Sequence, residues 1–287
     1  MNELEEETAI DIDRRVAKLL QELGVSEPPL DLGAVASFLH VDQGYYNLAD
    51  PSLIREFEHK LRVGAHNVAS LFQKIDLRGL WLPDRNQILI DQGLAEARQR
   101  WATAHELCHG FLPTHRPFFL GDTAETLDPE YHEMLEQEAN FCTQRLLFLG
   151  TRFDDDARSL PVCLASVMEM KKRYANSIAS TLRRYVGAMH DQLVVGIISQ
   201  AKWNHPELSA AQRCRYMFKS KIFDRSFENV SGPTLVHAID GYVVQRRGGP
   251  VGTHVVPVAN KSGYGFGFKS ESFFNCHDIL TLMVADI

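Results

Sequence analysis

The chain has 287 residues, of which 45% are hydrophobic and 23% are charged, so it is long enough and apolar enough to form two folded domains. Its formal net charge of −7 excludes a general nucleic-acid coat protein, although a local basic patch is compatible with it. The first residues are acidic and lack an apolar core, which excludes a signal peptide, and no apolar run reaches the roughly 18 residues of a membrane span. We therefore expect a cytoplasmic protein without a membrane partner.

The N-terminal half predicts helices around one pair of strands. Apolar side chains recur at helical spacing over residues 8–24 and stop at Gly24, and a second, shorter helix follows with Asp31 as its N-cap. Residues 78–92 read as two short strands around a polar turn. Further along, we expect a helix over 94–111, a proline-containing loop over 113–130 and a helix over 131–148.

The second half changes from helical to strand-like character. We expect a hinge at "TRFDDDARSLP" and two helices over about 160–173 and 177–189, with Ser177 as a cap. From residue 192, segments rich in Val, Ile and Phe alternate with turn residues and predict strands. These segments are "LVVGIIS", "TLVHAIDGYVVQR", "THVVPVAN", "YGFGFKS" and "ILTLMVAD".

The stretch "ATAHELCHGF" carries two histidines four residues apart within the helix predicted over 94–111. Residues four apart lie on one helix face, so His105 and His109 can bind one Zn²⁺ ion together. Glu106 projects to the side of that face, where it is poorly placed as a ligand but can reach a metal-bound water. The pattern therefore predicts a metal-assisted hydrolase with Glu106 as its general base.

A third ligand should come from farther along the chain, and four side chains compete for that role. Glu136 is favoured, because it can complete a His₂Glu site from the next helix while Asn140, one turn on, supports a ligand histidine. Glu138 projects from a different face of that helix, and Glu133 is a weaker choice. His115 has the spacing of a third histidine ligand, but Leu112 stands where that pattern needs a glycine to turn the chain.

These residues carry a family resemblance. "RQRWATAHELCHGFL" followed by "EQEANFCTQRLLF" resembles the paired motifs of the ImmA/IrrE family of bacterial metallopeptidases, and the similarity covers about residues 10–190. The resemblance implies a zinc-dependent endopeptidase in which His105, His109 and Glu136 are the metal ligands and Glu106 is the catalyst. The sequence departs from the family pattern at Cys108, where glycine is common, and in the longer segment after His109.

The resemblance also implies a substrate and an architecture. Family members cleave a helix-turn-helix transcriptional repressor and thereby switch on stress, DNA-damage, phage-defence or mobile-element genes. The fold class is then α+β, with a zincin-like metallopeptidase domain over 1–150, a helix-turn-helix-like segment over 151–190 and a strand-rich, sensor-like regulatory domain over 191–287. A candidate trigger is a small molecule, DNA or single-stranded nucleic acid that contacts the aromatic stretch 263–275 or the basic residues 171–184.

A different class of function competes with this interpretation, namely a DNA-binding regulator whose zinc site is structural or vestigial. The glutamate next to His105 argues against it, because a structural site has no use for a base beside an open position. Five scattered cysteines indicate reduced, mostly buried thiols. Cys108 lies within the motif, so a thiolate that blocks the open zinc position is a further hypothesis. Candidate donors for an oxyanion are Tyr131, His132 and His115, which the sequence does not rank.

Overall fold

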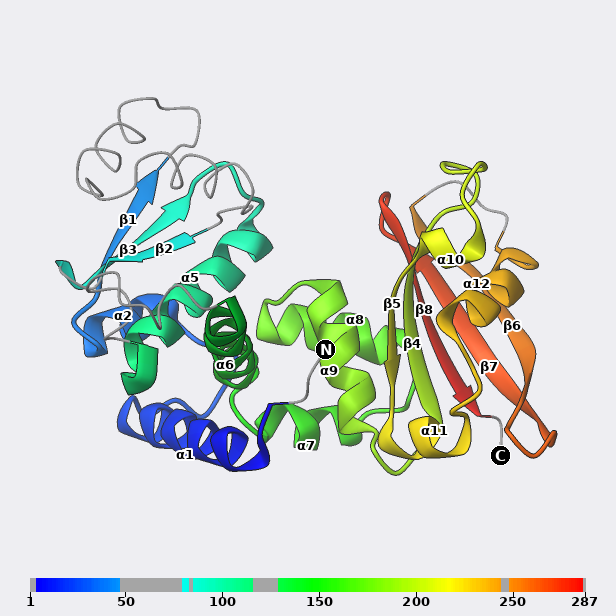
Figure 1. The fold of residues 1–287 in the computed structure, drawn as a ribbon, viewed down its shortest axis with the longest axis horizontal. Coiled ribbons are helices and arrows are strands. Elements are labelled where there is room, and N and C mark those ends of the chain that lie inside the picture. Colours follow the sequence, from blue (N-terminus) through cyan, green and yellow to red (C-terminus); the bar gives the residue numbers. More distant parts are fainter. Residues whose placement is uncertain (1–3, 47–78, 83–84, 116–128, 244–247, 286–287) are drawn as a thin grey trace. The chain divides into compact units, whose positions relative to one another are not determined.

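The structure is a computed structural model that describes residues 4–46, 79–82, 85–115, 129–243 and 248–285 (Figure 1). The chain divides into two compact units: unit 1 is Met1–Thr151 with Tyr174–Asn176, and unit 2 is Arg152–Arg173 with Ser177–Ile287. The division into three domains stays a prediction, because compactness shows which residues pack together and not which segments fold alone. Within the described ranges, no helix combines the length and the apolar character that a bilayer span requires.

Unit 1 combines helices with a small sheet. Its elements are α1 (Glu6–Glu22), α2 (Leu32–Phe38), β1 (Asp42–Tyr46), β2 (Gly79–Leu82), β3 (Gln87–Asp91), α5 (Glu96–Phe111) and α6 (Pro129–Leu147). The predicted caps are confirmed: Gly24 follows α1 with a φ of 65°, and the Asp31 carboxylate accepts hydrogen bonds from the first turn of α2.

The sheet of unit 1 has the strand order β1-β3-β2, with β1 parallel and β2 antiparallel to β3. The predicted strand pair within 78–92 is confirmed, and its register places Leu82 opposite Gln87. Helix α5 packs against β2 and β3 and also against α6. The approach is close, since a Cβ added at Gly110 would lie 3.0 Å from the Trp81 ring. Strand β2 is thereby fixed directly over the helix that carries the histidines.

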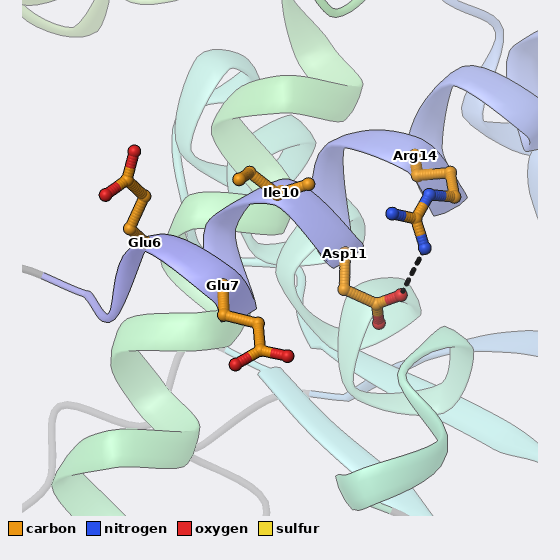
Figure 2. A pocket seen from close by; sticks show the side chains of 5 residues that line it. All are labelled: Glu6, Glu7, Ile10, Asp11 and Arg14. Atoms are coloured by element: carbon orange, nitrogen blue, oxygen red, sulfur yellow. Dashed lines mark ion pairs between the residues drawn. The ribbon is translucent and has the colours of Figure 1, made fainter.

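The outer surface of α1 carries a hollow lined by Glu6, Glu7, Ile10, Asp11 and Arg14 (Figure 2). Within it, Arg14 Nη1 and Asp11 Oδ1 form an ion pair at 3.7 Å. The side chains of both partners are largely exposed, so solvent screens their interaction. The hollow contains none of the motif residues and has no place in the chemistry considered below.

Unit 2 is a larger sheet with helices around it. Its elements are α7 (Arg152–Arg158), α8 (Leu164–Tyr174), α9 (Ile178–Ala188), β4 (Val194–Gln200), α10 (Ala210–Arg213), β5 (Cys214–Lys219), α11 (Lys221–Ser226), α12 (Gly232–Asp240), β6 (Gly249–Ala259), β7 (Gly265–Phe274) and β8 (Asp278–Ala285). The sheet order is β5-β4-β8-β7-β6, and every neighbouring pair is antiparallel. The strand-rich C-terminal part and the α+β class predicted from the sequence are confirmed.

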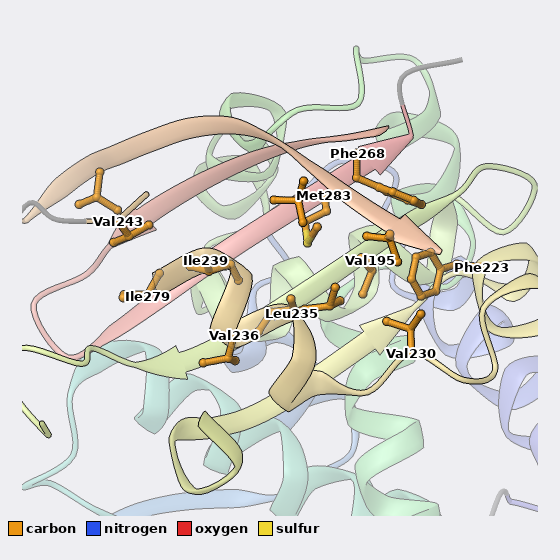
Figure 3. Packing of buried hydrophobic residues seen from close by; sticks show 14 of the residues in the cluster. Val195, Phe223, Val230, Leu235, Val236, Ile239, Val243, Phe268, Ile279 and Met283 are labelled. Atoms are coloured by element: carbon orange, nitrogen blue, oxygen red, sulfur yellow. The ribbon is translucent and has the colours of Figure 1, made fainter. Parts of the chain in front are cut away.

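Helices pack on both faces of this sheet at β4, the second strand in the order, because successive side chains of a strand point to opposite faces. On one face, a Cβ added at Gly196 would meet Val186 and Leu182 of α9 at 3.0 and 3.2 Å. On the other face, Val195 and Ile197 join a buried cluster with side chains of α11, α12, β7 and β8. Figure 3 shows this cluster, including Val195, Phe223, Leu235, Val236, Ile239, Phe268 and Met283.

Two predictions of local structure were wrong. The acidic stretch after residue 151 is not a hinge but helix α7, whose Phe153 and Ala157 are buried one turn apart. The segment "TLVHAIDGYVVQR" is not a strand at its start, because residues 232–240 form α12. The Ser231 hydroxyl caps that helix, and Leu235, Val236 and Ile239 share one buried face. Packing against the sheet therefore outweighs the strand preference of the β-branched residues.

The predicted helix pair is α8 and α9, and the Ser177 hydroxyl caps α9 through Ser180 N. Two of its basic side chains are in ion pairs with α7: Arg184 with Asp154 at 2.6 Å and Arg173 with Asp156 at 3.2 Å. The start of α8 is tied to the sheet, since Leu164 N donates a hydrogen bond of 2.8 Å to the Glu271 carboxylate of β7.

Candidate metal centre

Helix α5 brings His105 and His109 together on one face, as the four-residue spacing predicts. Their Nε2 atoms lie 3.1 Å apart, and the rings meet edge to face with centroids 4.8 Å apart. Both side chains are largely buried, with exposed fractions of 15% for His105 and 4% for His109. Two imidazole nitrogens therefore converge on one small volume beside α6.

Glu136 of α6 completes the group. Its Oε2 lies 3.2 Å from His105 Nε2, and its Oε1 lies 3.4 Å from His109 Nε2. Tetrahedral zinc with ligand bonds of about 2.0–2.1 Å separates its ligand atoms by roughly 3.3 Å. The three observed separations fit that figure, and these donor atoms form a group able to hold a metal ion. The Glu136 side chain is 39% exposed, which leaves a route to the site from solvent.

The other side chains considered for the third ligand lie elsewhere. His115 is fully buried and contacts His109 on the Nδ1 side, away from the converging Nε2 atoms. Glu138 Oε2 lies 3.0 Å from His115 Nε2. Glu133 is exposed and accepts a hydrogen bond from Gln137. Asn140 is exposed as well, and no described hydrogen bond joins it to either histidine of the group.

Glu106 is buried beside the group in a place shaped by strand β2. A Cβ added at Gly79 would lie 2.7 Å from Glu106 Cγ and 2.8 Å from its Oε1, so only glycine leaves room for this carboxylate. Burial raises the pKa of Glu106 to about 7, and the negative charge of Glu136 adds to the effect. The His105 charge and a hydrogen bond from the Trp81 backbone N–H oppose it. A carboxyl group with a pKa near neutrality is suited to accept and return a proton.

The three converging side chains differ in their affinity for protons. Burial lowers the pKa of His109 to about 4, although its hydrogen bond to Glu136 opposes the shift. For His105, burial is outweighed by the hydrogen bond to Glu136 and by the charges of Glu106 and Glu136, so its pKa is raised. Burial would raise the pKa of Glu136, but a hydrogen bond from His105, and one from His109 when that ring is protonated, outweigh it and hold the pKa far below the ordinary value. At neutral pH, Glu136 is thus an anionic donor and His109 a neutral one.

Cys108 points away from the group and into the interface of α5 with α6. Its thiol is fully buried and forms a hydrogen bond with the Cys142 thiol, which is the largest cause of the raised pKa of Cys142, ahead of burial. Neither sulfur belongs to the set of converging donor atoms. The hypothesis of a Cys108 thiolate on the metal therefore has no support in the geometry.

Several residues around the site escaped the sequence analysis. Gly79 and the Trp81 backbone act through contacts made only in the fold, and no local pattern signals them. Tyr46 ends β1, and its pKa is raised by burial and then by the charges of Asp91 and Glu106, which places its hydroxyl in their electrostatic neighbourhood. Of the suggested oxyanion donors, His115 is held by Glu138, whereas the side chains of Tyr131 and His132 lie outside the described residues.

A helix with paired histidines under a small sheet, completed by a glutamate from the following helix, defines the zincin-like class of metallopeptidase folds. Residues 60–185 match the model of the IrrE N-terminal-like domain, peptidase family M78. This part of the chain is therefore similar to the peptidase domain of that metallopeptidase family, and the resemblance drawn from the paired motifs is confirmed.

The whole chain also has a counterpart among solved structures. Over 96% of this chain and 88% of the other, its fold is similar to that of a Mycobacterium tuberculosis transcriptional regulator, with a TM-score of 0.54 and 10% sequence identity. At that identity the likeness concerns the fold alone. No curated protein matches the chain.

Proposed function

We propose that this protein is a zinc-dependent endopeptidase of the cytoplasm that cleaves a specific helix-turn-helix transcriptional repressor. The observation that carries the proposal is the convergence of His105, His109 and Glu136 within 3.1–3.4 Å of one another, with the buried carboxyl of Glu106 beside them. The donor set of two imidazoles and one carboxylate is that of a catalytic zinc site with one position left open.

Each side chain then has a distinct role. A zinc ion in this group supplies a Lewis acid for a peptide carbonyl and lowers the pKa of a water molecule. With the ion bound, Glu106 would accept a proton from the attacking water and deliver it to the leaving amine, and a pKa of about 7 in the metal-free site suits that role. His105, His109 and Glu136 hold the ion, and the contact with Gly79 keeps Glu106 in place.

The nature of the substrate rests on the family and on the fold. The paired motifs resemble those of peptidases that cleave helix-turn-helix repressors, and the similar solved structure is described as a transcriptional regulator. A role in transcription regulation is consistent with both. Which stress, defence or mobile-element genes respond depends on the repressor that is cut.

The test is cleavage of a purified helix-turn-helix repressor, and the first candidate to try is any such protein encoded beside this gene. The wild-type protein loaded with one zinc ion per chain should cut it at one position, which mass spectrometry of the fragments identifies. Glu106→Gln should keep the zinc and lose cleavage by about 10²- to 10⁴-fold. Glu133→Gln, an exposed change on α6, is the matched control and should behave as wild type. Cleavage by Glu106→Gln at the wild-type rate would refute the mechanism.

The alternative is a DNA-binding regulator with a structural or vestigial zinc site. The similarity in fold to a transcriptional regulator and the presence of the helix pair α8–α9 favour it. Two basic residues of that pair, Arg173 and Arg184, are engaged by Asp156 and Asp154, which reduces the charge available to phosphates. Zinc-loaded protein that binds the repressor's promoter specifically and never cuts the repressor would support this alternative.

Regulation by the C-terminal region is a further part of the proposal. The aromatic stretch 263–275 divides between two environments: Phe268 and Phe274 are in the core, whereas Tyr264 and Phe266 are 71% and 38% exposed. Exposed rings at the end of a hairpin offer a stacking surface for a base or another flat ligand. A trigger that binds there activates the enzyme only if it prefers the active form.

A further inference from the structure

We propose that His115 and Glu138 are positioning residues that hold His109 in the tautomer whose Nε2 carries the lone pair that binds a metal ion. This proposal concerns the same metal site and rests on the proposed function. It gives a role to two buried ionisable side chains that neither bind the metal nor contact a substrate in the mechanism above.

The geometry is a line of three side chains that leads away from the metal group. His109 Nε2 faces His105 and Glu136, while His109 Nδ1 lies 2.9 Å from His115 Nδ1. The other nitrogen of that ring, His115 Nε2, lies 3.0 Å from Glu138 Oε2. Both separations are hydrogen-bond lengths, so each of the two contacts needs exactly one proton.

The positions of the protons follow from the end of the line. The second contact is satisfied when His115 Nε2 donates and a carboxylate oxygen of Glu138 accepts. In a neutral imidazole the other nitrogen is then bare, and His115 Nδ1 accepts. The proton between the two rings belongs to His109 Nδ1, which leaves His109 Nε2 with the lone pair that metal binding requires.

Burial makes this arrangement selective. His115 has no exposed surface and Glu138 is 7% exposed, so water cannot replace either partner without disrupting the packing. Thr114 Oγ1 also donates to Glu138 Oε2, at 3.4 Å, and holds the carboxylate from a second side. Among the described residues, His105 Nδ1 has no hydrogen-bond partner. The line therefore orients one of the two histidines and not the other.

The end of α5 explains how His115 reaches this place. Leu112 leaves the helix with an extended backbone before Pro113, and a short turn closes with His115 N donating to Leu112 O at 3.1 Å. The turn folds His115 back beneath His109 without the glycine that would be needed to bring it to the metal. The side chain consequently meets the far nitrogen of His109, where a partner of a metal ligand belongs.

Zinc affinity tests the proposal without any measurement of activity. In competition with a chelator, His115→Phe and Glu138→Leu should each raise the zinc Kd by about 10- to 100-fold, the usual effect of removing such a partner. Glu138→Gln keeps an oxygen that accepts from His115 and should recover most of that loss. Glu133→Gln, exposed on the same helix, should have the wild-type Kd. Wild-type affinity in both His115→Phe and Glu138→Leu would overturn the proposal.

A second measurement reads the tautomer in the unaltered protein, and a variant serves only to assign the signal. Nitrogen-15 NMR of the metal-free, histidine-labelled chain should show His109 protonated at Nδ1 and bare at Nε2, with the signal assigned by His109→Gln. A signal for His109 protonated at Nε2 would mean that His115 donates instead of accepting, and would overturn the proposal. Absence of repressor cleavage would count against the proposed function alone, since neither the Kd nor the tautomer depends on it.

Discussion

The two units bury polar groups of different kinds. In unit 1, the buried region around α5 holds ionisable side chains: Glu106, His109, His115 and Glu138. In unit 2, the sheet core holds hydroxyls, with Tyr242 Oη bonded to Ser270 and Ser272, and Ser272 bonded in turn to Thr281. Hydroxyls can satisfy one another as neutral donors and acceptors, whereas buried carboxyl and imidazole groups change charge with their surroundings. The difference locates reactive chemistry in the first unit.

A buried charge is not by itself a sign of a reactive site, and the pair Arg213 and Asp240 in unit 2 is an example. They form a buried ion pair in unit 2, with Arg213 Nη1 2.8 Å from Asp240 Oδ1 and Nη2 in contact with the other oxygen. A bidentate pair of this kind is closed, because each charge already has its partner. Glu136, by contrast, faces two imidazoles and solvent, and thereby leaves room for a third species.

The largest effect should come from Glu136→Ala. Removing one of three ligands, and the only anionic one, should cost the protein most of its zinc, because two neutral imidazoles on an open surface hold the ion weakly. Elemental analysis after gel filtration measures the content. Asp240→Asn, which disrupts a buried carboxylate in unit 2, should keep one zinc ion per chain provided it folds. One zinc ion per chain in Glu136→Ala would show that Glu136 is not a required ligand, and would contradict the assignment of the metal site in unit 1.

A second effect concerns the stability of the metal-free protein. The pKa of Glu106, raised by burial to about 7, means that the folded chain binds this proton more tightly than the unfolded chain, whose carboxyl titrates near its ordinary value of 4.5. The folded state therefore loses stability as pH rises from about 4.5 to 7 and gains none back above that. Glu106→Gln should remove a cost on the order of 3 kcal/mol at pH 8 and nearly none at pH 4.5.

Urea unfolding in the presence of a chelator checks this pH dependence. Glu133→Gln, the exposed control on α6, should change stability little at either pH. Equal stability of Glu106→Gln and wild type at pH 8 would show that the carboxylate is better solvated than its burial implies. Unit 1 would then not differ from unit 2 in burying a group whose charge is costly.

A third effect tests the fit of Glu106 under β2. Gly79→Ala places a methyl group 2.7 Å from Glu106 Cγ, so we expect a loss of about 1–3 kcal/mol from overpacking and a drop in cleavage with zinc retained. The control is Gly187→Ala in α9, where an added Cβ meets nothing within 4 Å and should stabilise the helix by roughly 0.5–1 kcal/mol. Thermal melts and a cleavage assay of the same samples separate the two outcomes.

The smallest effect should come from the hydroxyl network of unit 2. Tyr242→Phe leaves Ser270 and Ser272 without a shared partner and should cost about 1 kcal/mol, or somewhat more if their hydroxyls stay unpaired. Zinc affinity should not change, because no ionisable group of the metal site is involved. A shift of the zinc Kd in Tyr242→Phe would contradict the separation of roles between the two units.

Much of the site could be predicted because its signals are local. Histidines four apart reveal a helix face, and Glu136 follows from the helical phase of the next segment. The strands β1 and β5 were missed because neither sequence, DQGYY nor CRYMFK, alternates apolar with polar residues. Helix α12 was misread because Val and Ile suit either structure. The contacts of Gly79 with Glu106 and of His115 with Glu138 join segments about 25 residues apart, and their pairing is decided by packing alone.

The hydrogen bond from Leu164 N to Glu271 has a consequence for how this protein can be divided. The segment recognised as one family runs to residue 185, yet α8 and α9 belong to the compact unit of the sheet, where Glu271 fixes the start of α8 and Gly196 receives α9. The boundaries of the family match therefore differ from the boundaries of the compact units. A cut after residue 190 would strip α9 of its apolar cover at Leu182 and Val186, so a dissection of this chain is better done by point changes at Glu271 than by truncation.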